Sequence, residues 1–290
     1  MHDQRLDQTP VPLLRPAVLW IGACLDQELA LARSWAEELA EVWEAPTPDA
    51  AIAAPPEAFL ERSPAAIMLA SPTPGRWSLV DCSTLSRRWP LAPLVSVAGS
   101  LVEGRRRSGP ALHGVEEVAW NELPGRMAWW MHDRIRDRPG SLGLPATARR
   151  EERLLEAAER VAEFATRPGR RVSVAASRAG DVEGLADVLT AAGRPPLRRT
   201  CGRPTLDEPA DILFWDVSEI SATDLAWLAM LTANRPDLAV VLLDSFPRCD
   251  STRAVLRAGG RAVISRPLSL ETLTGMLLRL ETSPIATHPG

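Results

Sequence analysis

The chain has 290 residues, a hydrophobic content of 46% and a formal net charge of −4, which fit a packed globular protein with room for two domains. This acidic balance gives no general attraction to nucleic acid or to an anionic membrane surface. All 33 basic residues are arginine, so mechanisms that need a lysine, such as a P-loop or a Schiff base, are excluded.

The cysteines and the chain start indicate the compartment. The four cysteines are scattered and form no CxxC pair, which argues against a zinc site. The polar start carries no signal-peptide pattern, and no run approaches the roughly 18–20 apolar residues of a membrane span. We therefore expect a cytoplasmic protein with reduced cysteines and no membrane segment.

Apolar runs alternate with helical patterns along the first half of the chain. We expect strands at 17–22, 65–70, 93–98 and 115–120, and helices at 25–42, 78–89 and 124–135. The segment 44–56 is rich in Ala and Pro and should break the pattern. A short helix is expected at 56–61.

A linker should separate the two halves. Residues 138–145 are rich in Gly and Pro, and 149–166 form a strongly patterned helix that either bridges the halves or pairs with a partner helix. The expected organisation is a polar arm, a first domain, a linker with its helix, a second domain and a tail, at 1–15, 16–137, 138–168, 169–282 and 283–290.

The second half repeats the alternation. Strands are expected at 171–176, 196–200, 211–215, 238–243 and 261–265, with helices at 181–192, 222–232, 249–257 and 268–280. An offset of 145 residues relates the strand at 66–70 to that at 211–215. The predicted fold is α/β, with two doubly wound parallel sheets in tandem.

Three strands of the second half end on polar residues. Asp216 follows one apolar run, Asp244 a second, and Arg266-Pro267 a third. Because parallel strands bring their carboxyl ends to one edge of a sheet, these side chains should meet there. The spacings are 28 residues from Asp216 to Asp244 and 22 from Asp244 to Arg266.

The stretch 258–268, Ala-Gly-Gly-Arg-Ala-Val-Ile-Ser-Arg-Pro-Leu, together with these spacings, resembles the receiver domain of two-component response regulators. The resemblance covers 170–281 and, more weakly, 16–135. It implies two flavodoxin-like folds, each with a five-stranded sheet, Asp216 as the phosphoacceptor position and a cis bond before Pro267. In an active receiver, acidic residues after the first strand hold Mg²⁺, a Thr or Ser ends the fourth strand, and a Lys ends the fifth.

The chain departs from that pattern at four positions. Ser177 and Arg178 stand where the acidic pair belongs, Asp244 takes the hydroxyl position with Ser245 beside it, and Arg266 replaces the lysine. A carboxylate nucleophile needs a metal and a cation to offset phosphoryl charge. We therefore expect the arginines to pair with Asp216 and Asp244, giving a self-neutralised site without a cofactor. Mg²⁺ would bind only if Asp216 is active.

The first half carries no phosphoacceptor. Ser71 occupies the acceptor position, Gly22-Ala23-Cys24 replaces the acidic residues although Asp26 is near, and Asn121 stands at the lysine position. The resemblance thus describes tandem degenerate receivers, or pseudo-receivers.

Other candidate residues favour packing over chemistry. His113 and His132 accompany no catalytic motif, and Arg105–Arg107 is expected to be a solvated loop with no nucleic-acid partner. Adjacent Trp129 and Trp130 cannot both face one core from a helix. One of them is therefore a candidate for an interface.

Two functional hypotheses remain. A third, an enzyme of flavodoxin-like fold, is supported by no motif. The first is a non-catalytic signalling or interaction protein that acts through protein contacts. The second is a response regulator still switched at Asp216, by phosphorylation or by a small molecule. The resemblance implies a histidine kinase or another regulator of a phosphorelay as partner, and a homodimer is compatible with either hypothesis.

Overall fold

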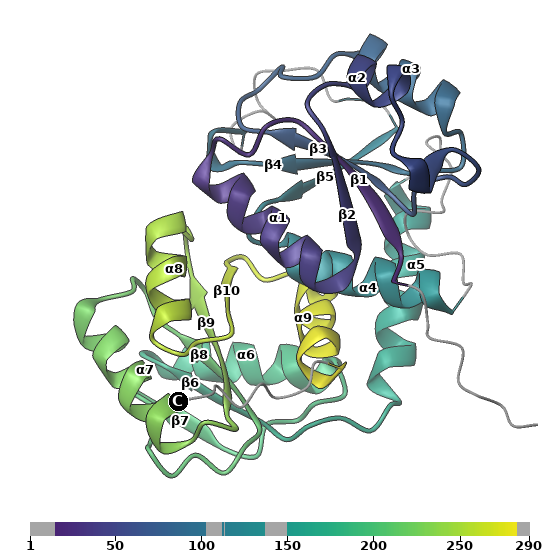
Figure 1. Ribbon diagram of the computed structural model, residues 1–290. Coiled ribbons are helices and arrows are strands. Elements are labelled where there is room, and N and C mark those ends of the chain that lie inside the picture. The colour runs from purple at the N-terminus through teal and green to yellow at the C-terminus, as the bar shows by residue number, and fades with distance from the viewer. Residues whose placement is uncertain (1–14, 103–111, 113, 137–149, 283–290) are drawn as a thin grey trace, which may run out of the picture.

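The computed structural model describes residues 15–102, 112, 114–136 and 150–282. Residues 1–14 of the predicted arm, the linker 138–145 and the tail, together with His113 and Arg105–Arg107, lie outside these residues. Two separate α/β units stand side by side, each with a central sheet, and helix α5 (Arg150–Ala165) runs alongside both (Figure 1). Among the described residues, no helix is both long and apolar enough to cross a membrane.

The first sheet contains five parallel strands in the order β2-β1-β3-β4-β5. They are β1 (Ala17–Ile21), β2 (Glu41–Ala45), β3 (Ile67–Ser71), β4 (Leu94–Ala98) and β5 (Val115–Ala119). Helices α1 (Gln27–Leu39) and α4 (Leu123–Ile135) pack on one face. Helices α2 (Pro48–Ala53) and α3 (Leu79–Arg88) cover the other.

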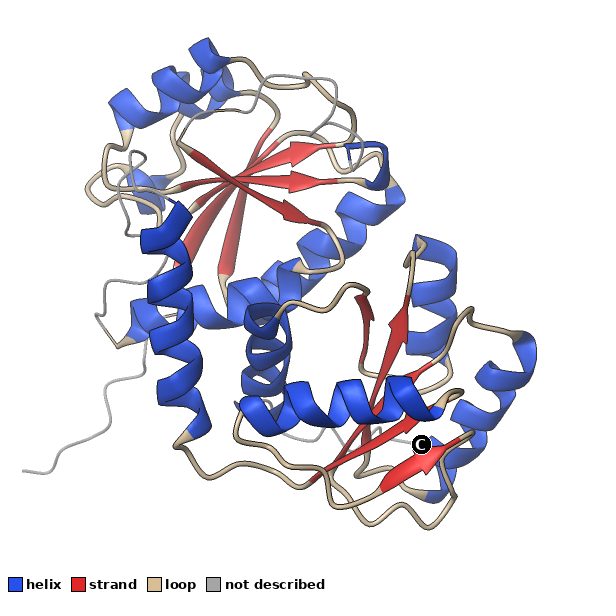
Figure 2. Cartoon of the chain, turned by 180° about the vertical axis from the view of Figure 1, so that it is seen from behind, coloured by secondary structure: helices blue, strands red, loops and turns tan. Residues whose placement is uncertain are grey.

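The second sheet repeats this order as β7-β6-β8-β9-β10, again with all strands parallel. Its strands are β6 (Val172–Ala176), β7 (Arg199–Cys201), β8 (Ile212–Asp216), β9 (Ala239–Asp244) and β10 (Ala262–Ser265). Helices α6 (Ala179–Ala191) and α9 (Leu270–Thr282) cover one face, and α7 (Ala222–Asn234) and α8 (Cys249–Arg257) the other. The predicted fold class, two flavodoxin-like doubly wound sheets, is confirmed (Figure 2).

The central strands form where the sequence has continuous apolar runs. β1, β3, β4, β6, β8 and β9 are buried along their whole length, as expected for strands covered by helices on both faces. Side chains alternate between the two faces, so that Leu213 and Trp215 pack towards α7 while Ile212 and Phe214 pack towards α6.

The prediction for residues 25–61 was wrong in two places. The first helix ends at Leu39 instead of Val42, and Glu41–Ala45 is the edge strand β2, paired in parallel with β1. Ala40 adopts an extended conformation, and ladder hydrogen bonds then outweigh the weak helical tendency of the β-branched and aromatic residues that follow.

The short helix expected at 56–61 is also misplaced. An α-helix forms earlier, at Pro48–Ala53, where the hydroxyl of Thr47 accepts a hydrogen bond from the Ala50 N–H. Only the single 3₁₀ turn Glu57–Phe59 falls within the predicted range. A threonine followed by proline is a recognisable helix start.

Candidate functional site

The carboxyl edge of the second sheet collects the polar residues that the sequence singled out. The strand register places Asp216 beside Leu243 and Ser265 beside Asp244. Asp216 and Asp244 are both buried, with 6% and 8% of their surface exposed. The edge therefore holds two carboxylates with little access to water.

Arg266 contacts Asp216 directly through its guanidinium group. Its guanidinium donates from Nη1 to Asp216 Oδ2 at 3.0 Å and from Nη2 to Ser245 Oγ at 3.0 Å. The peptide bond between Arg266 and Pro267 is cis, as the resemblance implied. One arginine thus links the ends of β8, β9 and β10.

Burial controls the acidity of Asp216. Removal of the carboxylate from water raises its pKa above the ordinary aspartate value. The positive charge of Arg266 opposes this rise, and the negative charge of Asp181 adds to it. The ion pair therefore compensates only part of the cost of burying the charge.

Ser177 and Arg178, at the other side of the edge, stand away from this contact. Both are exposed, and Arg178 occupies the N-cap of α6 without a side-chain capping bond. No ion pair joins Arg178 to Asp216 or Asp244 within the described part of the chain. The expected pairing is thus made by Arg266 alone, and Asp244 instead accepts a hydrogen bond from the Phe246 N–H at 3.3 Å.

Sequence reasoning missed Asp181. It was assigned to the start of a helix, but α6 already begins at Ala179, and Asp181 lies in its first turn, close enough to act on Asp216. Its position, five residues after the end of β6, was the available signal, because a strand end and the next helix start share one edge of the sheet.

The donor set does not fit Mg²⁺ in the manner of a receiver. That ion prefers oxygen ligands in octahedral geometry, supplied by one or two carboxylates besides water. Here Asp216 is engaged by a guanidinium, and a serine and an arginine occupy the positions of the acidic pair. No three His, Cys, Asp or Glu side chains gather as a metal site among the residues described.

The same edge of the first sheet is built from structural contacts. Ser71, at the end of β3, is 2% exposed and bonds to Ser96 Oγ at 2.8 Å. Asp26 caps α1 by accepting from the Glu28 N–H at 2.8 Å, and the Glu28 carboxylate accepts from Ser100. Asn121, at the lysine position, is buried. These acidic groups therefore hold loops and a helix end in place.

A dense contact between α4 and α9 joins the two domains. A Cβ atom on Gly275 would lie 2.1 Å from the Gly125 carbonyl oxygen, and one on Gly125 would lie 2.8 Å from the Thr272 oxygen. The two helix backbones therefore cross in direct contact, which only glycine permits.

Trp129 enters the core of the second domain and donates to Thr274 Oγ1 at 3.2 Å, whereas Trp130 packs in the core of the first domain. The two tryptophans thus divide between the cores, as the sequence indicated.

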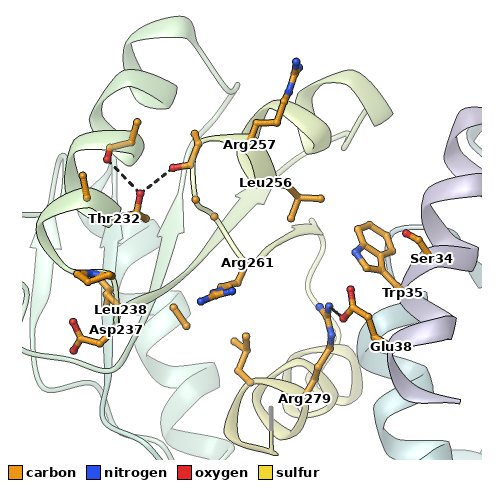
Figure 3. Close-up of a pocket in the computed structure, with 18 of the residues that line it drawn as sticks. Ser34, Trp35, Glu38, Thr232, Asp237, Leu238, Leu256, Arg257, Arg261 and Arg279 are labelled. Atoms are coloured by element: carbon orange, nitrogen blue, oxygen red, sulfur yellow. Dashed lines mark hydrogen bonds and ion pairs between the residues drawn. The ribbon is translucent and has the colours of Figure 1, made fainter. Parts of the chain in front are cut away.

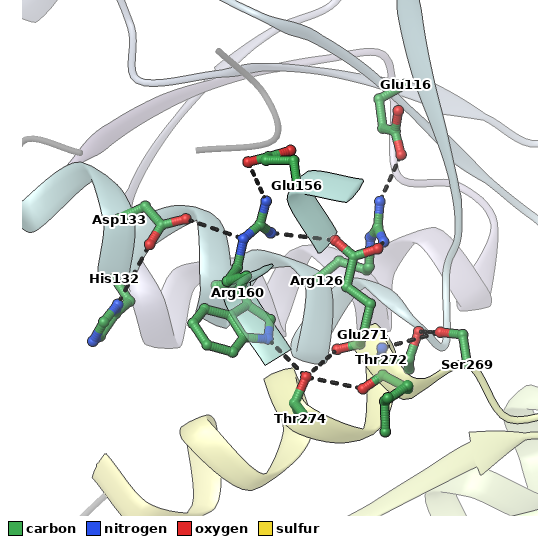
Figure 4. Close-up of polar contacts among 12 residues, drawn as sticks. Glu116, Arg126, His132, Asp133, Glu156, Arg160, Ser269, Glu271, Thr272 and Thr274 are labelled. Atoms are coloured by element: carbon green, nitrogen blue, oxygen red, sulfur yellow. Dashed lines mark hydrogen bonds and ion pairs between the residues drawn. The ribbon is translucent and has the colours of Figure 1, made fainter. Parts of the chain in front are cut away.

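Charged side chains surround this crossing (Figure 4). Arg160 of α5 contacts Glu156 at 2.5 Å, Glu271 of α9 at 3.3 Å and Asp133 of α4 at 3.7 Å. Arg126 of α4 pairs with Glu271 and with Glu116 of β5. Helix α5 therefore bridges the halves, the first of the two roles considered for it.

The contact joins equivalent positions of the two halves of the chain, which indicates that the two domains are related by a pseudo-twofold axis. Both Arg126–Glu271 and Trp129–Thr274 join residues 145 apart, close to the separation of the two helix starts at Leu123 and Leu270. In a symmetric pair, residues on the axis meet their own equivalents. The two domains thus dock through equivalent helices.

No protein-family model matches the chain, and no curated protein matches it. Solved structures resemble part of it. A protein of Burkholderia pseudomallei named as pilus assembly-related has 26% identity over 38% of this chain and 88% of its own, with a TM-score of 0.36. A CheY-like protein, tadZ, of Pseudomonas aeruginosa has 25% identity over 38% of this chain and 98% of its own, with a TM-score of 0.32. A response regulator of Thermotoga maritima has 19% identity over 40% and 100%, with a TM-score of 0.35.

Proposed function

We propose that this chain is a non-catalytic signalling protein, in which tandem receiver-like domains act through contacts with other proteins. The observation that carries the proposal is the contact of Arg266 with Asp216 at 3.0 Å. The acceptor carboxylate is buried and already paired, so an incoming phosphoryl group would have to displace a charge-assisted hydrogen bond.

The surrounding residues support this assignment. Phosphoryl transfer depends on positioning and on positive charge around the transferred group. Asp244 places a second carboxylate at this edge, and Asp181 a third negative charge near Asp216. The residues at this edge do not form a Mg²⁺ site that would offset these charges, so the carboxylates repel a phosphoryl dianion.

The helix faces of the fold can serve protein–protein contacts in place of phosphoryl transfer. The two domains already dock through α4 and α9, and α5 is clamped across the joint. A helix face that is not used in the joint can bind a groove of a protein partner, which is a common mode of recognition. A regulator of a phosphorelay remains the partner class that the receiver-like fold favours.

Phosphorylation tests the proposal directly. The full chain is incubated with Mg²⁺ and acetyl phosphate, or with beryllofluoride, while intact mass and the fluorescence of Trp215, next to Asp216, are recorded. We expect no adduct and no change in fluorescence. An adduct that disappears in Asp216→Asn would establish the switched regulator instead.

A restored variant makes a negative result informative. Ser177→Asp, Arg178→Asp and Arg266→Lys together return the acidic pair and the lysine of an active receiver. We expect this variant to respond to beryllofluoride where the natural chain does not, because its donor set then fits Mg²⁺. Protein partners that co-purify with the natural chain should also co-purify with Asp216→Asn.

A further inference from the structure

A cavity of about 800 Å³ lies in the seam between the two domains (Figure 3). One wall is α1 of the first domain, and a second is the C-terminal end of α9. The third wall consists of the ends of α7 and α8 and the starts of β9 and β10. A water molecule takes roughly 30 Å³ of liquid, so the cavity has room for several whole side chains.

Helix α5 fills the equivalent half of the seam. The pseudo-twofold axis exchanges α1 with α6, since each follows the first strand of its domain, and it exchanges α9 with α4. Helix α5 lies between α6 and α4, because Phe164 packs in one cluster with Leu189 of α6 and Trp129 of α4. At the end of α6, a Cβ atom on Gly193 would lie 2.3 Å from the Ala165 carbonyl oxygen. The contact with α6 is therefore as close as a helix contact can be.

The cavity is the counterpart of the α5 position. Figure 1 shows α5 on one side of the α4–α9 crossing, and α1 with α8 on the other. Within the described part of the chain, no second helix takes the corresponding place between α1 and α9. One half of a nearly symmetric seam thus holds a helix of this chain, and the other half remains a groove.

The lining of the groove is apolar at its centre. Leu31 and Trp35 line it from the first domain, and Ala233, Leu256 and Leu280 line it from the second. Figure 3 shows Trp35 facing Leu256 across the space. Leu280 also belongs to the same buried cluster as Trp129 of the joint. The groove therefore continues the established interface between the domains.

Two ion pairs border this apolar centre. Glu38 pairs with Arg279 at 2.5 Å, and Asp237 pairs with Arg235 at 2.8 Å. An apolar centre with a polar rim is the usual composition of a protein–protein interface. Because these charges are already compensated, the groove suits an apolar face more than a charged ligand.

The walls of the groove are fixed in shape. Gly259 has a φ of +92°, and a Cβ atom there would lie 2.4 Å from Thr232 Oγ1. The Thr232 hydroxyl donates to the Ala258 carbonyl at 2.9 Å. On the other wall, Trp35 stacks on Trp120 with ring centroids 6.0 Å apart. The two walls are therefore preorganised, which reduces the entropy that binding costs.

We propose that this groove binds an amphipathic α-helix of a protein partner, in the position that α5 occupies on the other side of the crossing. Apolar residues at helical spacing lie between Trp35 and Leu256, and the polar face of the helix remains in solvent. Because the helix contacts both domains, it stabilises the docked pair. The proposal rests on the proposed function, since it names the surface and the kind of partner for an interaction protein.

Two displayed peptide libraries test the proposal on the full chain. The first presents peptides of 16 residues, the length of α5, with randomised apolar residues on one helix face of an alanine-rich scaffold. The second differs only by a central proline, which breaks the helix. We expect the chain to enrich binders from the first library and not from the second. The strongest helical peptide should also raise the melting temperature of the chain.

Two variants locate the binding site of that peptide. Ser34→Trp fills the groove from α1 and Ala233→Trp fills it from α7, and both residues are exposed, so the new side chains do not enter a core. Each should weaken the peptide at least about tenfold. Ser83→Trp, at an exposed serine of α3, is the matched control and should leave the affinity unchanged. Circular dichroism melting confirms that each variant is folded.

The outcomes separate this proposal from the proposed function. No enrichment, equal enrichment of the two libraries, or an affinity that survives both groove variants would overturn the helix groove. An Asp216 adduct in the phosphorylation assay would overturn the non-catalytic assignment, whereas the peptide affinities would still decide whether the groove binds a helix.

Discussion

The carboxyl edge of the second sheet and the α4–α9 joint use their polar residues in different ways. At the edge, a single arginine pairs with one of two buried carboxylates. At the joint, two arginines contact acids from three helices and a strand, around helix backbones in direct contact. Charge therefore links elements of both domains at the joint, whereas at the edge it links the ends of strands within one sheet.

The strongest test of the joint is Gly275→Ala. The new Cβ would overlap the Gly125 carbonyl, and neither helix backbone can move without separating the domains. The free energy of unfolding should fall by about 2 kcal/mol or more, despite the better helix propensity of alanine. Urea unfolding followed by circular dichroism should then show two transitions in place of one.

The control is Gly184→Ala in α6. A Cβ atom at that position meets nothing within 4 Å, so the substitution should stabilise the chain by about 0.5–1 kcal/mol. If Gly275→Ala behaved like this control, the backbone contact between the two domains would be refuted.

The second test is Arg160→Met. Arg160 is 7% exposed and lies among Asp133, Glu156 and Glu271. Its removal takes this cation away from Asp133 and Glu156, whereas Glu271 keeps its pair with Arg126. The loss should cost about 3 kcal/mol at neutral pH. Burial already raises the pKa of Glu156, and Arg160 opposes that rise.

The pH dependence of this variant follows from that arrangement. Burial raises the pKa of Glu156, so without Arg160 this carboxyl takes up a proton more readily in the folded than in the unfolded chain, and the loss of stability should shrink as the pH falls. Arg199→Met, which breaks an exposed pair with Glu183, should cost below about 1 kcal/mol at any pH. A pH-independent loss in Arg160→Met would contradict the ion network.

Much of the fold was predictable because buried parallel strands read as unbroken apolar runs. The runs at 17–22 and 211–215 gave β1 and β8 almost to the residue. Strand β2 was missed because an edge strand is covered less completely, and its sequence Glu-Val-Trp-Glu-Ala carries no such run. Tertiary pairing with β1 decided its conformation.

The candidate site was predictable in part, and the joint hardly at all. The spacing from Asp216 to Arg266 brought two residues to one edge, and they do meet. The partners of Arg160 come from helices up to 111 residues away, and the sequence carries no signal for such distances. Gly125 and Gly275 look like weak points of helices, and only the crossing explains them.

The smallest expected effect concerns the edge itself, through Asp216→Asn. Burial raises the pKa of Asp216, so the folded chain binds a proton there more readily than the unfolded chain, and stability contributed by this group is lost as the pH rises through that range. The neutral asparagine avoids this loss, while Arg266 keeps Ser245 as a partner. Asp216→Asn should therefore unfold at slightly higher urea concentration than the natural chain near pH 7, and this gain in stability should vanish near pH 4.

The control variant Asp211→Asn should lose stability near pH 7, because hydrogen bonding from Arg171 lowers the pKa of Asp211 and stabilises its charged form. If Asp216→Asn destabilised the chain as Asp211→Asn does, the ion pair with Arg266 would outweigh the burial of the carboxylate, and the edge would resemble the joint after all.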